Sequence, residues 1–485
     1  MDKVKVRFAP SPTGYLHLGG ARTALFNWLF ARQMKGKFVL RIEDTDKERH
    51  QEDKIKQIIS SLEWLGMKSD EEIIFQSDNV ERHKAATFSL LKQGKAYYDF
   101  TPAGETHGYD EAVTTKIKRM NPYRDLPIKT AEVRSLNEPY CIRLKVPVEG
   151  QTEFDDMVFG HQVRNYDDIE DLVLIRTNGS PLYNLAVVED DFTMGITHVI
   201  RGQDHLTNTH KQVLLYEMLG YDKPVFAHLP LIFAPGKVKL SKRVHGAISA
   251  VDYYRDLGIS PRAMLNYLAL LGWSPGGNAQ YLSLEDLVDK FSFARVNKAP
   301  ATIMFNEQAE NIKKIDPKLL HLSSEHWRKT SIYKLTNYVN LALFSNGSKS
   351  SIYDPYTVNL LPLYLPRAKV MGDFVDPIVR IQSRNFSYPE ELCTVDNSIL
   401  SELIRQNINV AKATVSSNNN EGEYFTWIED NTNHIDRAEL HKFVRLILTG
   451  AENGPAPAAL IAAIGIDSLT DACIKFYREV TGDRD

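Results

Sequence analysis

The chain has 485 residues, about three times the ~150 residues of an average domain, so more than one folding unit is expected. Hydrophobic residues make up 43% and charged residues 25%, and the formal net charge is −4, which excludes a collagen-like chain, low-complexity disorder and a general polycation. Any nucleic acid must therefore bind to local basic patches.

The cysteines and the apolar runs indicate the cellular compartment of the protein. Cys141, Cys393 and Cys473 are too widely spaced for a CxxC metal pair or a disulfide framework, which fits a reducing compartment. No apolar run approaches the ~18 residues that a membrane span needs, and the first residues lack the apolar core of a signal peptide. We expect a soluble cytoplasmic protein without a membrane partner.

The first elements predict a βαβ unit. Residues 4–9 (VKVRFA) form a strand that stops at the turn 10–14 (PSPTG), and apolar positions from about 17 to 34 then follow the helical period. A second strand is expected at 38–42, so the sheet should be parallel. Further helices are expected at about 52–65 and 80–93.

Residues 97–190 differ in character, since they combine charged stretches, prolines and short β-rich pieces such as 140–146. We interpret them as an insertion into one α/β domain. The α/β pattern resumes at 182–188, 198–201, 208–219 and 226–232, helices are expected at 250–257, 261–272 and 283–291, and the C-terminal third has helical stretches such as 398–415 and 437–449.

Two separated segments carry candidate anion-binding chemistry. The turn 10–14 leads into His17, Leu18, Gly19 and Gly20 at a helix start, where free N–H groups and the helix dipole favour an anion. It is neither a P-loop nor a GxGxxG site, and an ordinary turn with incidental glycines is the alternative. Some 220 residues later, 239–243 (KLSKR) can clamp a polyphosphate, although a solvated surface cluster is the alternative.

Together these segments resemble the HIGH and KMSKS signatures of class I aminoacyl-tRNA synthetases. The strings 7–17 (RFAPSPTGYLH), 21–27 (ARTALFN), 41–46 (RIEDTD) and 199–205 (VIRGQDH) are similar to bacterial glutamyl-tRNA synthetases in particular. The matches keep the family order and spacing from residue 5 to about 275 and weaken towards the C-terminus.

The resemblance implies an α/β fold: a Rossmann-like catalytic domain, an inserted α+β acceptor-binding domain, a helical junction and an all-helical anticodon-binding region. The implied bounds are 1–96 and 191–250 for the two halves of the catalytic domain, 97–190 for the insertion, 251–325 for the junction and 326–485 for the anticodon-binding region.

The resemblance also implies the substrates, ATP and L-glutamate, and the roles of individual residues in the site. His17, Lys239 and Lys242 are the implied catalytic residues, which neutralise charge on the phosphates without a protein nucleophile. The implied ATP-binding residues are Pro10, Gly14, His17, Gly19, Gly20, Asp204, His205, Lys239, Leu240, Ser241, Lys242 and Arg243. Mg²⁺ is expected to accompany ATP rather than to occupy a protein cage.

Glutamate requires two cationic sites for its carboxylates and one anionic site for its ammonium group. By the resemblance, Arg7 and Tyr183 take the side-chain carboxylate, Arg201 the α-carboxylate and Glu43 the ammonium, with Ser11 alongside. Val187 stands where some relatives have asparagine, so another group or water should complete the carboxylate shell. Each residue taken alone can instead be structural, and only their joint occurrence in the family order favours the functional interpretation.

The insertion departs from some bacterial relatives because Tyr98–Thr101 replaces their Cys-x-Cys, so no structural zinc is expected. The partner tRNA(Glu) is expected to bind cations in the insertion and in the C-terminal region, although a solvated charged face is the alternative. The candidates are Lys116, Lys118, Arg119, Arg124, Arg367 and Lys369. A monomer is expected from the family.

Three rival functions remain. A glutaminyl-tRNA synthetase is opposed by 9–14 (APSPTG) and by the helical C-terminal region. A tRNA-modifying paralogue that glutamylates a base lacks an anticodon-binding region, for which this chain has ~160 residues. A catalytically dead RNA-binding module would be expected to lose signature residues, yet His17, Lys239 and Lys242 are all present.

Overall fold

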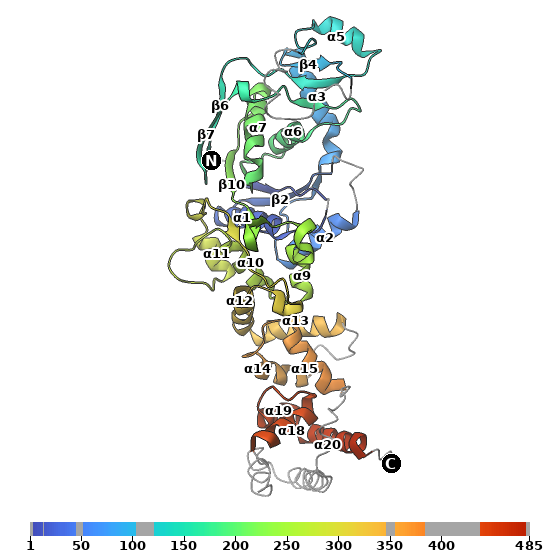
Figure 1. The fold of residues 1–485 in the computed structure, drawn as a ribbon, viewed down its shortest axis with the longest axis vertical. Coiled ribbons are helices and arrows are strands. Elements are labelled where there is room, and N and C mark those ends of the chain that lie inside the picture. The colour runs from blue at the N-terminus through green and yellow to red at the C-terminus, as the bar shows by residue number, and fades with distance from the viewer. Residues whose placement is uncertain are drawn as a thin grey trace. The chain divides into compact units, whose positions relative to one another are not determined.

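A computed structural model describes residues 3–12, 14–44, 52–102, 121–345, 355–383 and 437–481 (Figure 1). The chain divides into two compact units, of which the first comprises Met1–Asp256 and Met264–Asp316 and the second Leu257–Ala263 and Pro317–Asp485. Among the helices in these described ranges, none is both long and apolar enough to span a membrane.

The first unit is built around a seven-stranded sheet in the order β3-β2-β1-β9-β10-β6-β7. All neighbours pair in parallel except β6 and β7, which form an antiparallel hairpin. The strands are β1 (Lys5–Phe8), β2 (Lys37–Ile42), β3 (Ile74–Phe75), β6 (Gln151–Asp156), β7 (Gly160–Asn165), β9 (His198–Gly202) and β10 (Val225–Leu229). From β1 the chain continues outwards through β2 and β3 on one side, whereas from β9 it continues to β10 on the other side. Ligands of open α/β sheets bind at the carboxyl ends of the strands where the strand order reverses in this way.

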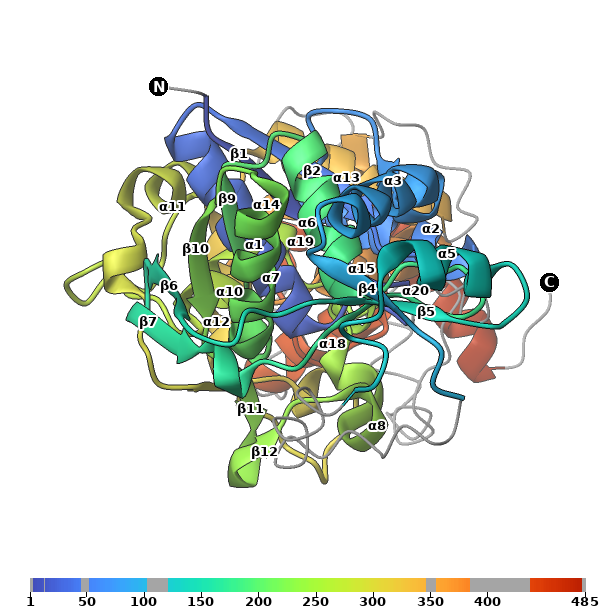
Figure 2. The same ribbon diagram turned by 90° about the horizontal axis from the view of Figure 1, so that it is seen from above.

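Helices cover both faces of this sheet, with α1 (Leu18–Gln33) on one face and α6 (Tyr183–Thr193) and α7 (Leu206–Leu219) on the other (Figures 1 and 2). The expected βαβ unit and the helices near 52–65 and 80–93 are confirmed, the latter as α2 (Glu52–Trp64) and α3 (Val80–Lys92). Gly36 ends the turn after α1, where a Cβ atom would collide with the Val4 carbonyl oxygen. That close approach starts β2 beside β1.

The segment 97–190 contributes to two sheets. β4 (Ala96–Asp99), β5 (Cys141–Leu144) and β8 (Val173–Ile175) form a separate antiparallel sheet near α5 (Ile128–Ser135), whereas the β6–β7 hairpin extends the main sheet. The hairpin is held there by apolar packing, since the Phe154 and Phe226 ring centroids lie 5.2 Å apart. The expected boundary at 190 falls inside α6, and one hydrophobic core includes side chains from both sides of it.

The first unit ends in short elements that carry the second signature. β11 (Ile232–Ala234), β12 (Val238–Lys239) and β13 (Ala301–Thr302) form a small sheet, and α8 (Lys242–His245) follows β12 directly. The three helices expected between 250 and 291 are present as α9 (Val251–Asp256), α10 (Pro261–Leu270) and α11 (Leu284–Lys290).

Every element longer than a turn in the described part of the second unit is a helix, as expected. They are α12 (Pro317–Arg328), α13 (Ile332–Ser345), α14 (Pro355–Tyr364), α15 (Gly372–Ser383), α18 (Arg437–Thr449), α19 (Pro457–Ile464) and α20 (Ile466–Thr481). Their apolar sides share one core that includes Trp327, Phe374 and Phe476. The expected boundary at 325 falls inside α12, and the helix expected at 398–415 lies outside the described residues.

Candidate active site

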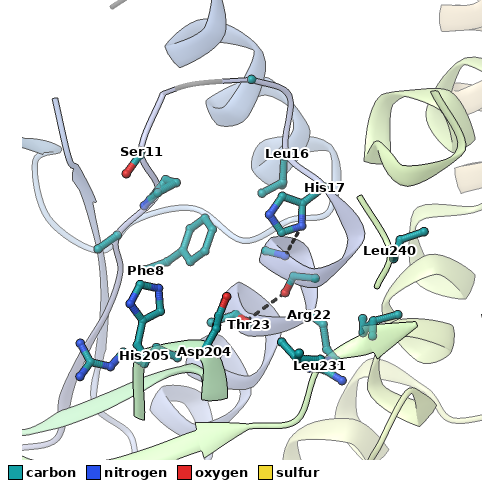
Figure 3. Close-up of a pocket in the computed structure, with 18 of the residues that line it drawn as sticks. Phe8, Ser11, Leu16, His17, Arg22, Thr23, Asp204, His205, Leu231 and Leu240 are labelled. Atoms are coloured by element: carbon teal, nitrogen blue, oxygen red, sulfur yellow. Dashed lines mark hydrogen bonds between the residues drawn. The ribbon is translucent and has the colours of Figure 1, made fainter. Parts of the chain in front are cut away.

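A cavity of about 950 Å³ lies where β1 and β9 end (Figure 3). Its walls bring together most of the predicted site residues: Arg7, Pro10, Ser11, Gly14, His17, Gly19, Gly20, Glu43, Tyr183, Arg201, Asp204, His205, Lys239 and Leu240. Ser241 follows the lining residue Leu240, and Lys242 and Arg243 start α8. The side chains of Lys242 and Arg243 lie outside the described part of the structure. The two signatures therefore meet in one cavity, although they are about 220 residues apart in sequence.

His17 caps helix α1 and keeps one ring nitrogen available to a ligand. Its Nδ1 accepts a hydrogen bond of 3.0 Å from the Gly20 N–H (Figure 3). The protein atoms around the ring lower its pKa, an effect that Asp204 opposes and Lys239 reinforces. A neutral imidazole that accepts at Nδ1 carries its proton on Nε2. The Nε2–H group can therefore donate a hydrogen bond to an oxyanion.

The glycines after His17 leave space for such an anion. A Cβ atom on Gly19 would lie 3.2 Å from the His17 ring, and one on Gly20 would lie 3.3 Å from Leu16 Cδ1. Larger residues would therefore crowd the ring and the loop that line the cavity. Because the backbone N–H groups at a helix start have no partner within the helix, this corner suits a phosphate.

Lys239 brings a cation to the same corner. Its Nζ lies 3.3 Å from Asp204 Oδ2, and the two side chains are 55% and 47% exposed. Such an exposed pair contributes about 0–1 kcal/mol to stability and exchanges readily for a stronger partner. Lys239 can therefore leave Asp204 for the phosphates of a bound nucleotide.

Arg7, which lines the cavity, belongs to a buried charge network. Arg7 Nε and Nη2 donate to Asp191 at 3.0 and 3.2 Å, and Arg41 Nη1 donates to the same carboxylate at 2.5 Å. Burial alone would raise the pKa of the Asp191 carboxyl, but Arg41 and Arg7 lower it overall. Asp191 therefore orients Arg7 and leaves its Nη1 as the nitrogen that can reach a ligand.

Glu43 is the acidic group of this region. Its Oε1 accepts from Arg41 Nη2 at 3.3 Å, while its backbone N–H donates to the Pro10 carbonyl at 3.0 Å. Burial raises the pKa of the Glu43 carboxyl, and the nearby Arg41 and Arg7 partly offset this. An ammonium group beside Glu43 would favour the charged form of the carboxylate.

Arg201 is a buried cation without a salt bridge to any described carboxylate. Its Nη2 donates to Thr209 Oγ1 and to Gln212 Oε1, both at 2.7 Å, and its Nε donates to His228 Nε2 at 3.3 Å. Its Nη1 is buried without a hydrogen-bond partner. A buried guanidinium normally pairs with an anion, so this arrangement is suited to a ligand carboxylate.

Tyr183 and His205 complete this side of the cavity. The Tyr183 hydroxyl and His205 Nδ1 lie 3.1 Å apart. Burial, followed by the proximity of Arg201, lowers the pKa of His205 to about 4, so the ring is neutral near pH 7. Val187, where some relatives have asparagine, is buried in the core and is not part of the cavity wall. Gln212, which accepts from Arg201, donates in turn to Asn184 Oδ1 through a hydrogen bond of 3.1 Å.

The candidate tRNA-binding residues lie outside this cavity. Arg124 Nε donates to Asp171 at 2.8 Å and is mostly buried, so we assign it a structural role. Lys116, Lys118 and Arg119 lie outside the described residues. In the second unit, Arg367 and Lys369 are exposed on either side of the buried Ala368.

Sequence reasoning missed the residues that support the site. Asp190, Asp191, Asp156 and His228 are all buried and hydrogen-bonded, yet none belongs to the motifs that carry the resemblance. The one available signal is three consecutive acids, Glu189, Asp190 and Asp191, in the helix 183–193, which is unusual for a helix with seven buried residues.

Comparison with known proteins agrees with this geometry. The sequence profile of the class I tRNA synthetases (E and Q), catalytic domain, matches residues 3–309, and the chain belongs to this family. It is 46% identical to a glutamate–tRNA ligase of Thermodesulfovibrio yellowstonii over 71% of this chain and 70% of that protein. It is 36% identical to the glutamate–tRNA ligase of Nitratidesulfovibrio vulgaris over 97% and 98% of the two chains.

Solved structures give the same result. The crystal structure of a glutamate tRNA ligase from Elizabethkingia meningosepticum, in complex with its amino acid, superposes with a TM-score of 0.74 at 28% identity. It covers 99% of this chain and 100% of that one. The resemblance to glutamyl-tRNA synthetases inferred from the motifs is thus confirmed over nearly the whole chain.

Proposed function

We propose that this chain is a glutamate–tRNA ligase that activates L-glutamate with ATP and transfers glutamate to the 3′ end of tRNA(Glu). The observation that carries the proposal is the cavity shared by two buried arginines, Arg7 and Arg201, and by the anion-binding corner at His17 and Lys239. A small dicarboxylate fits the first pair and a triphosphate fits the second.

Activation is an attack by the α-carboxylate oxygen of glutamate on the α-phosphorus of ATP. A new P–O bond forms, the bond to the β-phosphate oxygen breaks, and pyrophosphate leaves. We assign Arg201 to the α-carboxylate, Arg7 and Tyr183 to the side-chain carboxylate, and Glu43 to the ammonium group. Ser11, which also lines the cavity, is assigned to the same amino-acid site. These contacts hold the nucleophile in line with the phosphorus.

The negative charge that develops on the phosphates is met by donors at the other end. His17 Nε2–H, Lys239 and the loop with Lys242 are assigned to this role, with Pro10, Gly14, Gly19 and Gly20 shaping the loop. We assign Asp204, His205, Leu240, Ser241 and Arg243 to the nucleotide as well. Because His17 is neutral, it contributes a hydrogen bond rather than a full charge.

Mg²⁺ is proposed to enter with ATP. Within the described ranges no three His, Cys, Asp or Glu side chains are grouped for a metal cage. Mg²⁺ usually takes its ligands from phosphates, water and one or two carboxylates, and Asp204 is a cavity carboxylate that fits this role. When bound, the ion would reduce the negative charge of the triphosphate. That the chain needs no structural zinc stays a prediction.

In the second step the terminal ribose hydroxyl of tRNA attacks the carbonyl carbon of the adenylate, and AMP leaves. We propose that Lys116, Lys118 and Arg119 contact the acceptor end and that Arg367 and Lys369 contact the anticodon end, which would need exposed cations. A monomeric, cytoplasmic enzyme is expected.

ATP–pyrophosphate exchange with purified tRNA tests the activity. We expect exchange with glutamate and tRNA(Glu) and exchange at least about 100-fold weaker with glutamine. The family resemblance implies that activation requires bound tRNA, so no exchange is expected without it. Stronger exchange with glutamine would replace the proposal by a glutaminyl-tRNA synthetase. Glutamylation of a modified tRNA base instead of the terminal ribose would favour the tRNA-modifying rival.

The Lys242→Ala variant distinguishes the proposed ligase from a catalytically dead RNA-binding module. We expect this variant to lose at least about 100-fold in adenylate formation, because a transition-state donor is removed, while its tRNA affinity stays within about threefold. Filter binding and pyrophosphate exchange measure the two quantities. Unchanged exchange would remove Lys242 from the mechanism.

A further inference from the structure

A buried aspartate–histidine pair lies directly behind Arg201. Asp156, the last residue of β6, is 4% exposed, and His228 on β10 is fully buried. The His228 Nδ1 and Asp156 Oδ2 atoms lie 2.6 Å apart, and the other side of the ring, Nε2, lies 3.3 Å from Arg201 Nε. The pair therefore connects the β6–β7 hairpin to the arginine assigned to the substrate carboxylate.

The contacts of Asp156 fix it as an ionised acceptor. Besides the His228 ring, its carboxylate accepts the backbone N–H groups of Val158 (2.9 Å), Phe159 (2.8 Å) and His228 (3.0 Å). Burial raises the pKa of this carboxyl, but the bonds from His228, Phe159 and Val158 lower it overall. An ionised carboxylate can only accept, so the proton of the neutral ring must lie on Nδ1.

This tautomer is the one that Arg201 requires. A guanidinium is a donor only, so Nε2 of His228 must present its lone pair to the Arg201 Nε–H group. Nε2 is also 2.8 Å from Thr209 Oγ1, which in turn accepts from Arg201 Nη2 at 2.7 Å. Burial and the nearby Arg201 lower the pKa of His228, only partly offset by Asp156, so the ring stays neutral.

We propose that Asp156 and His228 are positioning residues that hold the Arg201 guanidinium in the orientation that binds the glutamate carboxylate. Asp156 acts through the ring: it selects the Nδ1–H tautomer, and the ring then accepts from Arg201 Nε. This fixes the plane of the guanidinium, whose Nη1 is the nitrogen that has no protein partner. The arrangement parallels the carboxylates that orient metal-bound histidines, with a guanidinium in place of the metal. The inference rests on the proposed function, since it assumes that Arg201 binds glutamate.

Asp156→Asn is the central variant. Because Oδ1 accepts both turn N–H groups, the new NH₂ group would face Nδ1 and favour the Nε2–H tautomer, which opposes Arg201 Nε–H. We expect the KM for glutamate to rise at least tenfold, while the KM for ATP stays within twofold. Asp155→Asn is the matched control, because Asp155 lies on the same hairpin, pairs with His161 at 2.9 Å and is 89% exposed. We expect no change in either KM for it.

A second substitution separates positioning from a general loss of structure. His228→Gln can place an amide oxygen near the former Nε2 without dependence on Asp156. We expect the KM for glutamate to rise about threefold in this variant and no further in Asp156→Asn/His228→Gln. The proposal would be overturned if the rises in the glutamate KM multiplied in the double variant, or if the KM values for glutamate and ATP rose equally.

The outcomes also distinguish this inference from the proposed function. If the wild-type enzyme does not charge tRNA(Glu) with glutamate, the proposed function is wrong. If it does so and Asp156→Asn keeps a glutamate KM within twofold of wild type, only the positioning role is wrong. Should Asp156→Asn fail to fold, His228→Gln and His228→Phe are compared instead. His228→Phe has no acceptor for Arg201, so its KM for glutamate should be at least fivefold higher than that of His228→Gln. Equal KM values in the two variants would refute the positioning role.

Discussion

The two ends of the cavity hold their charges in opposite ways. At the amino-acid end, Arg7, Arg41 and Asp191 are almost inaccessible to solvent, and both arginines bond to Asp191. At the nucleotide end, Lys239 and Asp204 are about half exposed and meet in a single long contact. A fixed network is suited to distinguishing one small substrate from its amide, whereas exposed cations can rearrange around a triphosphate that arrives and leaves as pyrophosphate.

The largest effect is expected from Asp191→Ala. Removing this carboxylate leaves Arg7 and Arg41 as buried charges without their shared partner, which should lower the free energy of unfolding by about 3–5 kcal/mol. Urea denaturation of the purified protein measures the change. Glu81→Ala is the control, since the Glu81 side chain is 84% exposed in its pair with Lys84, and we expect at most about 0.5 kcal/mol. A loss below about 1 kcal/mol for Asp191→Ala would show that the two ends do not differ as described.

A smaller and purely catalytic effect is expected from Lys239→Ala. The kcat/KM for ATP should fall about 100-fold, equivalent to ~2.7 kcal/mol, because a donor to the developing phosphate charge is lost. Stability should change by less than about 1 kcal/mol. Lys290→Ala removes another exposed, paired lysine and should leave both quantities unchanged. If Lys239→Ala instead raised the KM for glutamate and not that for ATP, its assignment to the nucleotide end would be wrong.

The smallest expected effect is the pH dependence of the stability that Asp191 contributes. Arg41 and Arg7 hold the pKa of Asp191 below its ordinary value despite burial. The stability contributed by this carboxylate is therefore fully present above the unfolded pKa of about 3.9 and is lost as the pH falls through the lower folded pKa. The stability difference between wild type and Asp191→Asn should shrink as the pH falls below about 4. Urea midpoints measured from pH 7 downwards test this, and a difference independent of pH would contradict it.

Much of the fold and the cavity wall could be predicted from the sequence because their signals are local. The turn at 10–14, the helical period after it and the alternation of elements each depend on neighbouring residues, and the predicted β1, α1 and β2 are present. The resemblance then assigned the ligand-facing residues, since these lie within continuous strings such as 7–17.

The supporting residues could not be predicted in this way. Arg7 and Asp191 are 184 positions apart, and Asp156 and His228 are 72 positions apart, so only the folded sheet shows that they pair. In the sequence, acids at helix and hairpin ends look the same as solvated surface acids. The pairing of the β6–β7 hairpin with β10 was missed for a related reason: which sheet a strand joins depends on tertiary packing.

One measurement tests the central claim most directly, namely that a single cavity distinguishes a carboxylate from its amide while holding an adenylate. Inhibition constants are compared for two non-hydrolysable sulfamoyl-adenosine analogues of the adenylate, one carrying glutamate and the other glutamine. We predict at least about 100-fold tighter binding of the glutamyl compound by wild type, with the preference reduced to below about tenfold in Arg7→Gln. Equal inhibition of the wild-type enzyme by the two compounds would contradict the account.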